Sequence, residues 1–314
     1  MPARIRARNT GSSAPESLSL EDSRRRLDHR IGLNIPYEWW PGAATLKAIE
    51  AAGFRWVQVA APAVEMLADP RHGVRHATAL RRCLEVTELC TVVHGPTSLQ
   101  LGSALHNRAF EGLLEYGQQI DASYVVYHAL DFPRRGHDTG AEEQALRRLA
   151  VTAEAMRITI CFENLCPVYP GRSSVCHDPL SVRDLLRRVD SPAVGMLLDI
   201  GHAHVVAGYM GVETSTLVEP VLGSVELFHV HDNFGARLRG AGDSPSVDPL
   251  QLDLHLPPGA GTVPWTVLRP LLLGHEAPLM MEIHPAHRPS PTTLRELATS
   301  LLGGREAAPA PAAG

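Results

Sequence analysis

The sequence predicts a closed (β/α)8 barrel, a TIM barrel made of one large α/β domain. Eight short apolar runs with strand character recur along the 314 residues, and segments with helical periodicity lie between them. Several of these runs end in His, Asp or Glu, residue types that a parallel barrel gathers at the carboxyl ends of its strands. A doubly wound open sheet is the less favoured arrangement of the same elements.

The expected elements alternate in chain order. The strands, each a run of mostly β-branched, aliphatic or aromatic residues, are 31–35, 54–60, 91–94, 124–128, 158–163, 194–199, 225–231 and 279–283. The helices, in which apolar residues recur three and four positions apart, are 43–52, 76–89, 108–120, 142–155, 179–189 and 267–273. Asp178 and Pro179 offer an N-cap and a first-turn proline to the fifth of these helices.

The two ends of the chain differ in composition from the predicted domain, residues 31–305. Residues 1–30 are rich in Arg and Ser without the apolar core of a signal peptide, and residues 306–314 are rich in Ala and Pro, so both are expected to be disordered tails. No apolar run is long enough to span a bilayer, and the five cysteines show no paired framework. We therefore expect a cytoplasmic protein with no membrane partner.

Charge and lysine content restrict the function further. The net charge of −5 gives no electrostatic reason to expect nucleic acid as a partner. Lys47 is the only lysine and lies in a helical pattern, which argues against Schiff-base catalysis. The sequence leaves the oligomeric state open, a homo-oligomer included.

The residues at the predicted strand ends indicate a metal enzyme. Buried Asp, Glu and His converging on one point are costly unless a divalent cation neutralises them. The positions at or just after these ends are His94, His128, Glu163, Asp199, His229 and Glu282.

A set of short motifs occurs in a characteristic order. They are the loop after His94 (residues 94–103), Val126-Tyr-His128, Phe162-Glu-Asn164, Asp199-x-x-His202, His229-x-x-Asp232, Asp253-x-His255 with Gly259 and Gly261, and Glu282. In this order they resemble the xylose isomerase-like TIM barrels, a superfamily that includes sugar phosphate isomerases and epimerases and the endonuclease IV group. The likeness spans nearly the whole barrel.

The resemblance implies a central divalent metal, Mn, Mg, Zn or Co, held by Glu163, Asp199, His229 and Glu282. It implies an isomerase or epimerase that acts on a small sugar, polyol or sugar phosphate through a metal-stabilised enediolate. Glu163 and Glu282 would exchange protons with carbon. His202 would contact the substrate or a second metal.

A larger ligand set keeps an alternative open. Together with the four central residues, nine positions match the complement that endonuclease IV-like proteins use for three metals, the added ones being His94, His128, His202, Asp253 and His255. One to three ions are therefore expected. The alternative is a multinuclear, zinc-type phosphoester hydrolase acting on a small phosphorylated substrate. Abasic DNA fits less well, because the chain is acidic and Thr97 stands where the endonuclease group typically has an aromatic residue.

Further residues are predicted to contact the substrate. They are Asn164 beside Glu163, Arg237 and Arg239 in a loop expected above the site, and Trp39 after the first strand. Ordinary surface arginines and a packed tryptophan are the plain alternatives. His231 is expected to face the opposite side of the sheet from His229 and to have a supporting or structural role.

Overall fold

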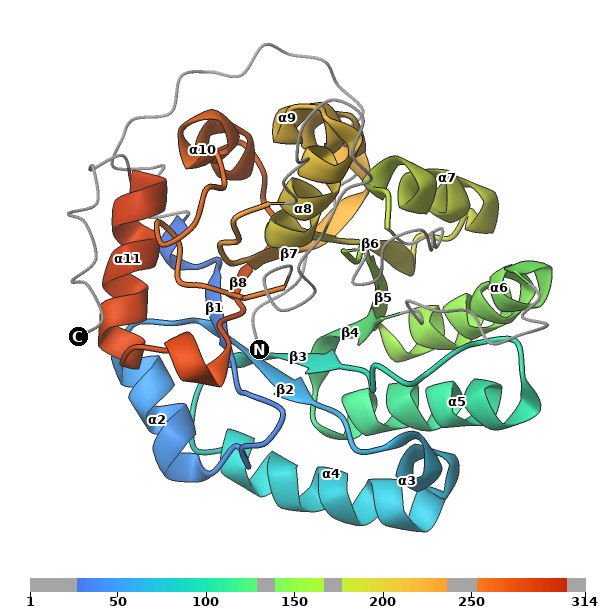
Figure 1. Ribbon diagram of the computed structural model, residues 1–314. Coiled ribbons are helices and arrows are strands. Elements are labelled where there is room, and N and C mark those ends of the chain that lie inside the picture. The colour runs from blue at the N-terminus through green and yellow to red at the C-terminus, as the bar shows by residue number, and fades with distance from the viewer. Residues whose placement is uncertain (1–26, 129–138, 167–176, 236–252, 304–314) are drawn as a thin grey trace.

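The structure is a computed structural model that describes residues 27–128, 139–166, 177–235 and 253–303. Eight parallel strands pair in chain order and the last pairs with the first, so the sheet closes into a barrel with a ring of helices around it (Figure 1). The predicted (β/α)8 barrel is confirmed. The strands are β1 (Ile31–Asn34), β2 (Trp56–Ala60), β3 (Cys90–His94), β4 (Ala122–Tyr127), β5 (Thr159–Glu163), β6 (Val194–Asp199), β7 (Val225–Val230) and β8 (Leu279–Met281).

The outer helices include all of the segments with helical periodicity. They are α2 (Ala43–Ala51), α3 (Val64–Ala68), α4 (Pro70–Leu84), α5 (Ala104–Gln119), α6 (Thr139–Met156), α7 (Pro179–Val189), α8 (Ile200–Met210), α9 (Thr214–Val218), α10 (Trp265–Leu273) and α11 (Pro291–Gly303), with 3-10 turns η1 (Glu219–Ser224) and η3 (Pro285–His287). Helix α4 starts earlier than predicted, because Asp69 caps it through the Arg71 amide and Pro70 occupies its first turn. Asp178 and Pro179 start α7 in the same way, as predicted.

Helix α8 is the longest element near the site that periodicity did not reveal. It follows β6 without a loop, because Asp199 ends the strand and accepts a hydrogen bond from the His202 amide at 2.7 Å. Most of its residues between Ile200 and Ala207 are buried, so the helix has no polar stripe to mark it. The short helices α3 and α9 and the last helix α11 were also missed.

Alternation along the strands builds the site. Outward side chains such as Phe162, Leu198 and Phe228 pack beneath the helices in the main core. Inward side chains fill the barrel with a smaller core that includes Val92, Val126, Cys161, Leu197, Leu227 and Met280. Two residues further along each of these strands, and so on the same face, stand His94, His128, Glu163, Asp199, His229 and Glu282. The predicted ligands thus form the next inward layer.

The ends of the described chain join the barrel. Leu27 is buried, and Arg30 donates hydrogen bonds to the carbonyl oxygens of Leu272 and Ala277. Residues 27–30 therefore pack on the folded domain. The remainder of both predicted tails lies outside the described residues.

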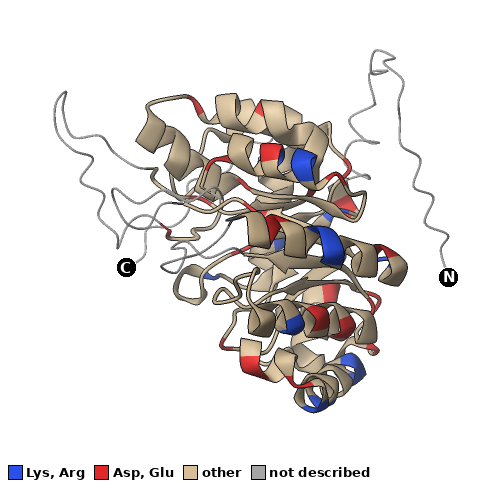
Figure 2. Ribbon diagram, turned by 90° about the vertical axis from the view of Figure 1, so that its right-hand side faces the viewer, with Lys and Arg blue, Asp and Glu red and all other residues tan. Residues whose placement is uncertain are grey.

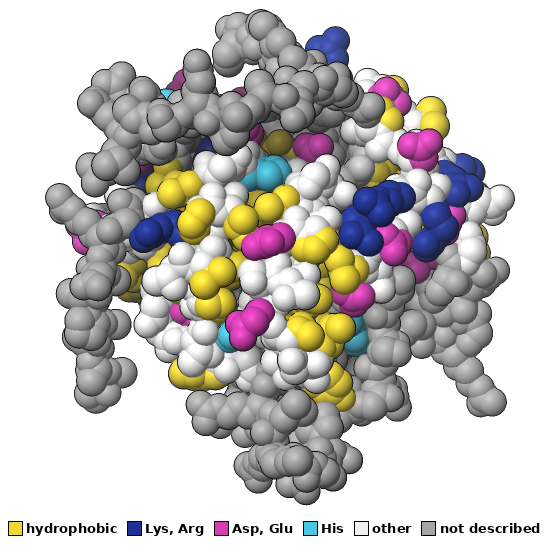
Figure 3. Space-filling view, turned by 90° about the horizontal axis from the view of Figure 1, so that it is seen from above, with side chains coloured by type: hydrophobic (Ala, Val, Ile, Leu, Met, Phe, Trp, Pro, Cys, Tyr) yellow, Lys and Arg dark blue, Asp and Glu magenta, His cyan; other side chains and the backbone are white. Residues whose placement is uncertain are grey.

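The surface shows mixed charge. Acidic and basic residues are interspersed along the outer helices (Figure 2), and on the face in Figure 3 basic side chains gather toward one side among hydrophobic and acidic ones. None of the helices in the described part of the chain has the length and apolar character of a membrane span. Cytoplasmic location stays a prediction.

Candidate metal centre

Four predicted ligands meet in what we call the strand cluster: Glu163, Asp199, His229 and Glu282. One ligand atom from each lies within 4.8 Å of the others. The Nδ1 atom of His229 lies 3.1 Å from Glu163 Oε1, 3.5 Å from Asp199 Oδ2 and 2.8 Å from Glu282 Oε2. The first three residues belong to the carboxyl ends of β5, β6 and β7, and Glu282 directly follows β8. Adjacent barrel strands therefore bring the cluster together.

Attraction between opposite charges determines the pKa values of the residues in the strand cluster. Burial alone would raise the pKa of Glu163, but His229 and His94 outweigh it and hold that pKa well below its usual value. Burial likewise opposes ionisation of Glu282, yet His229 lowers its pKa to about 2. In return, Glu282 and Glu163 overcome burial and raise the pKa of His229 well above its usual value. Three carboxylates, of which Glu163 and Asp199 are buried and Glu282 is partly exposed, thus gather around the positively charged imidazole of His229, and a divalent cation would stabilise the same arrangement.

His94 lies between the Gly95 carbonyl oxygen and Glu163, with Nδ1 2.8 Å from the former and Nε2 3.2 Å from Glu163 Oε2. Both neighbours only accept hydrogen bonds, so they favour a ring protonated on both nitrogens, and although burial opposes the charge, Glu163 raises the pKa of His94. The His128 ring lies 5.7 Å from that of His94, and its buried Nδ1 has no hydrogen-bond partner. Burial lowers the pKa of His128 to about 4, so the ring is neutral at neutral pH and able to bind a metal.

A second group, which we call the rim cluster, comprises His202, His231, Asp253 and His255, again with ligand atoms within 4.8 Å of one another. Asp253 Oδ1 lies 2.8 Å from His255 Nε2 and 3.3 Å from His202 Nε2. Among the described residues, this contact with Asp253 is the one polar interaction of the buried His202 Nε2 atom. Burial would lower the pKa of His255, but Asp253 raises it to about 9. The rim cluster therefore joins α8 to the segment that precedes α10.

The orientation predicted for His231 is wrong. Residues two apart on a strand share a face, and the buried His231 points to the same side as His229, with its Nε2 2.9 Å from Asp199 Oδ2. Its ring stacks on that of His255 at 3.8 Å and 12°. Parallel stacked rings do not aim their nitrogens at one ion, so His231 orients Asp199 more readily than it serves as a co-ligand with His255. A Cβ on Gly201 would lie 2.2 Å from the His231 ring, so glycine leaves room for this arrangement.

Asn164 and Asp232 act on the backbone around the site. Asn164 accepts a hydrogen bond from the Asp199 amide at 2.8 Å and donates to the Asp199 carbonyl oxygen at 3.1 Å. It is fully buried and does not line the cavity, so the structure places this predicted substrate contact as a brace for β6. The Asp232 carboxylate accepts hydrogen bonds from the amides of Gly259 and Val263 and from the Trp265 indole, and so anchors the loop before α10.

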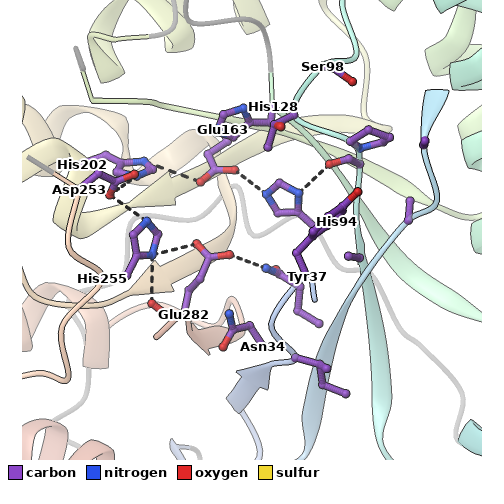
Figure 4. Close-up of a pocket in the computed structure, with 18 residues that line it drawn as sticks. Asn34, Tyr37, His94, Ser98, His128, Glu163, His202, Asp253, His255 and Glu282 are labelled. Carbon is purple, nitrogen blue, oxygen red and sulfur yellow. Dashed lines mark hydrogen bonds and ion pairs between the residues drawn. The ribbon is translucent and has the colours of Figure 1, made fainter. Parts of the chain in front are cut away.

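A cavity of about 440 Å³ opens beside both clusters (Figure 4). Seven predicted ligands line it: His94, His128, Glu163, His202, Asp253, His255 and Glu282. Small apolar residues also line the cavity, among them Ala60, Ala61 and Pro96. Asn34, Tyr37, Gln58 and Ser98 add polar groups that the sequence reasoning missed. Gln58 follows Trp56 by two residues on β2, the same spacing that marks the ligands on other strands.

The other predicted substrate contacts lie elsewhere. Trp39 lines a separate cavity of about 210 Å³, where the Arg288 guanidinium lies 5.8 Å from its ring centroid. Arg237 and Arg239 lie outside the described residues. Their contact with a substrate stays a prediction.

The comparisons with known proteins agree with this geometry. The family described as xylose isomerase-like TIM barrel matches residues 46–301. The chain belongs to this family. Comparison with curated proteins finds no match.

Several solved structures share the fold. A D-tagatose 3-epimerase-like protein is 20% identical, with a TM-score of 0.66 over 87% of this chain and 97% of that one. A 3-keto-D-glucoside 4-epimerase from E. coli is 14% identical, with a TM-score of 0.60 over 87% and 98%. A xylose isomerase domain protein from Salmonella typhimurium is 18% identical, with a TM-score of 0.61 over 88% and 97%. At these identities the likeness shows the fold alone.

Proposed function

We propose that this protein is a divalent-metal-dependent isomerase or epimerase of a small sugar, polyol or sugar phosphate. The observation that carries the proposal is the placement of Glu163 and Glu282. They stand three strands apart around the barrel, both line the cavity, and both face His229 Nδ1. Two carboxylates on different sides of one pocket can take a proton from one face of a carbon and return it at another.

The strand cluster fits a divalent cation. Glu163, Asp199, His229 and Glu282 would hold it, a set of hard oxygens with one imidazole that suits Mn, Mg, Co or Zn. When bound, the ion supplies positive charge against the negative charge that develops on a substrate oxygen as a neighbouring carbon loses its proton.

The surrounding residues prepare the two carboxylates for proton transfer. His94 and His229 hold the two oxygens of Glu163 in place, at 3.2 Å and 3.1 Å. The small side chains of Ala60 and Ala61 in the lining leave room for a small polyol.

The lining also bears on the substrate. None of the described residues that line the cavity is Lys or Arg. A phosphate group would then depend on a bound metal or on loops outside the described residues, so we favour an unphosphorylated sugar or polyol. The names of two structural neighbours, a D-tagatose 3-epimerase-like protein and a 3-keto-D-glucoside 4-epimerase, support a keto sugar as the first class to test.

Solvent exchange tests the proposal. The Mn²⁺- or Co²⁺-loaded protein is incubated in D2O with a panel of ketoses such as D-fructose and D-tagatose, and the sugars are analysed by NMR. We expect deuterium at a carbon next to the carbonyl group, and we expect Glu163→Gln to abolish its incorporation. Metal-loaded protein that exchanges no carbon-bound hydrogen in a broad panel of sugars and polyols would contradict the proposal.

The rim cluster keeps a second function open. With His94 and His128 it could hold further ions beside the strand cluster, as a multinuclear phosphoester hydrolase requires. Zinc-loaded protein that releases alcohol from small phosphodiesters or phosphate from phosphomonoesters, without exchanging sugar protons, would support this function instead.

A further inference from the structure

Gln58 is a polar side chain inside the metal centre that is only 3% exposed. Its Nε2 donates a hydrogen bond to Glu282 Oε1 at 2.9 Å, and its Oε1 lies 2.8 Å from His229 Nε2. We propose that Gln58 is a positioning residue that fixes the tautomer of His229 and the orientation of Glu282. This inference rests on the proposed metal site.

The two contacts determine which way the Gln58 amide points. A carboxylate only accepts hydrogen bonds, so the amide nitrogen must face Glu282. The amide oxygen is then left to face His229, and it can only accept. The Nε2 atom of His229 therefore carries a proton and donates it to Gln58.

The tautomer determines which atom of His229 can bind a metal. With the proton held on Nε2, the lone pair of the neutral ring is on Nδ1. Nδ1 is the atom that lies among the carboxylate oxygens of Glu163, Asp199 and Glu282. Gln58 thus aims the lone pair at the cluster and keeps the competing tautomer from forming.

The second contact acts on Glu282. Gln58 engages Oε1, while Oε2 faces His229 Nδ1 at 2.8 Å. The carboxylate therefore presents one oxygen to the centre and cannot rotate without breaking the bond from Gln58. Gln58 on β2 thus connects His229 on β7 with Glu282, which directly follows β8.

A direct test needs no substitution. Long-range ¹H–¹⁵N spectra of Zn²⁺-loaded wild-type protein report which nitrogen of each assigned histidine carries the proton. We expect His229 to be protonated on Nε2, with the zinc-bound signal on Nδ1. A proton on Nδ1 would overturn the inference.

A substitution tests the energetic consequence. Gln58→Met keeps much of the side-chain volume but removes both hydrogen bonds, and Gln118→Met on the exposed side of α5 is the matched control. We expect Gln58→Met to weaken Co²⁺ binding by about 10- to 100-fold in competition with a chelator, as losses of partners of metal-bound histidines do. We expect Gln118→Met to bind Co²⁺ like wild type.

The inference and the proposed function can fail separately, because neither readout needs turnover. Co²⁺ affinity of Gln58→Met within about twofold of wild type would overturn the role of Gln58 and leave the metal site standing. Wild-type protein that binds neither Zn²⁺ nor Co²⁺ would contradict the proposed function and this inference together. If Gln58→Met does not fold, the wild-type spectra decide.

Discussion

The strand cluster and the rim cluster lie next to each other but contain different types of ligand. The strand cluster has three carboxylates and one imidazole, at positions in or directly after barrel strands. The rim cluster has three imidazoles and one carboxylate, and two of its members, Asp253 and His255, belong to the segment between β7 and α10. Three carboxylates thus come from the strands or from the residue directly after one, whereas the rim cluster takes its imidazoles from α8, from the residue after β7 and from the segment before α10.

This difference in ligands indicates that the two clusters have different roles. Oxygen-rich sites suit Mn, Mg and Co, whereas imidazole-rich sites favour Zn. In the proposed isomerase the strand cluster carries the reaction, and the rim cluster shapes the cavity or holds a further ion. The following predictions test this difference in roles.

The largest effect is expected in the strand cluster. Glu282→Gln removes a proton-transfer group and one anionic ligand while preserving the shape of the side chain. We expect turnover, measured as deuterium exchange into sugar, to fall by about 10³-fold, within the range for loss of a general acid or base. The exposed Glu65→Gln on α3 should retain wild-type activity. A fall of less than about tenfold for Glu282→Gln would contradict the assigned role.

A smaller effect concerns the pH dependence of stability without metal. The pKa of His255 is raised from 6.5 to about 9 in the folded chain, so its charge stabilises the fold below pH 6.5, and this stabilisation is lost as pH rises to 9. At 1.36 kcal/mol for each pKa unit, the loss is on the order of 3 kcal/mol. Chelator-treated protein should therefore melt at lower temperature at pH 9 than at pH 6.5.

His255→Ala isolates the contribution of His255 to this pH dependence, because the pKa values of His202 in the rim cluster and of His229 in the strand cluster shift in the same direction. The variant should show a flatter decline of melting temperature than wild type. An equal decline in the two proteins would show that His255 does not contribute.

The smallest effect is expected on isomerisation when the rim cluster is disabled. We expect the double variant Asp253→Asn, His255→Ala to keep turnover within about tenfold of wild type, because both proton-transfer carboxylates remain. A different result would favour the multinuclear hydrolase. In that case the double variant would lose 10³-fold or more of its turnover, and it would also lose a phosphoester cleavage that the wild-type protein carries out.

The same contrast explains how far sequence could predict this protein. Strand ends are marked by apolar runs that stop at a ligand type, so the positions of Glu163, Asp199 and His229 followed from local pattern and family order. Gln58 was missed because an amide is not a typical ligand, although its spacing from Trp56 marks it as inward-facing. The contacts of Asn164 with the Asp199 backbone could not be predicted from the sequence, because they depend on the pairing of β5 with β6. Arg237 and Arg239 lie outside the described residues.

The proposed function depends on a divalent ion bound by the strand cluster. Elemental analysis of protein purified without added metal or chelator, repeated after reconstitution with Mn²⁺, Co²⁺ or Zn²⁺, tests it most directly when wild type is compared with Asp199→Asn. We predict at least one ion per wild-type chain, reduced in Asp199→Asn. No bound ion in the wild-type chain even after reconstitution would contradict the account.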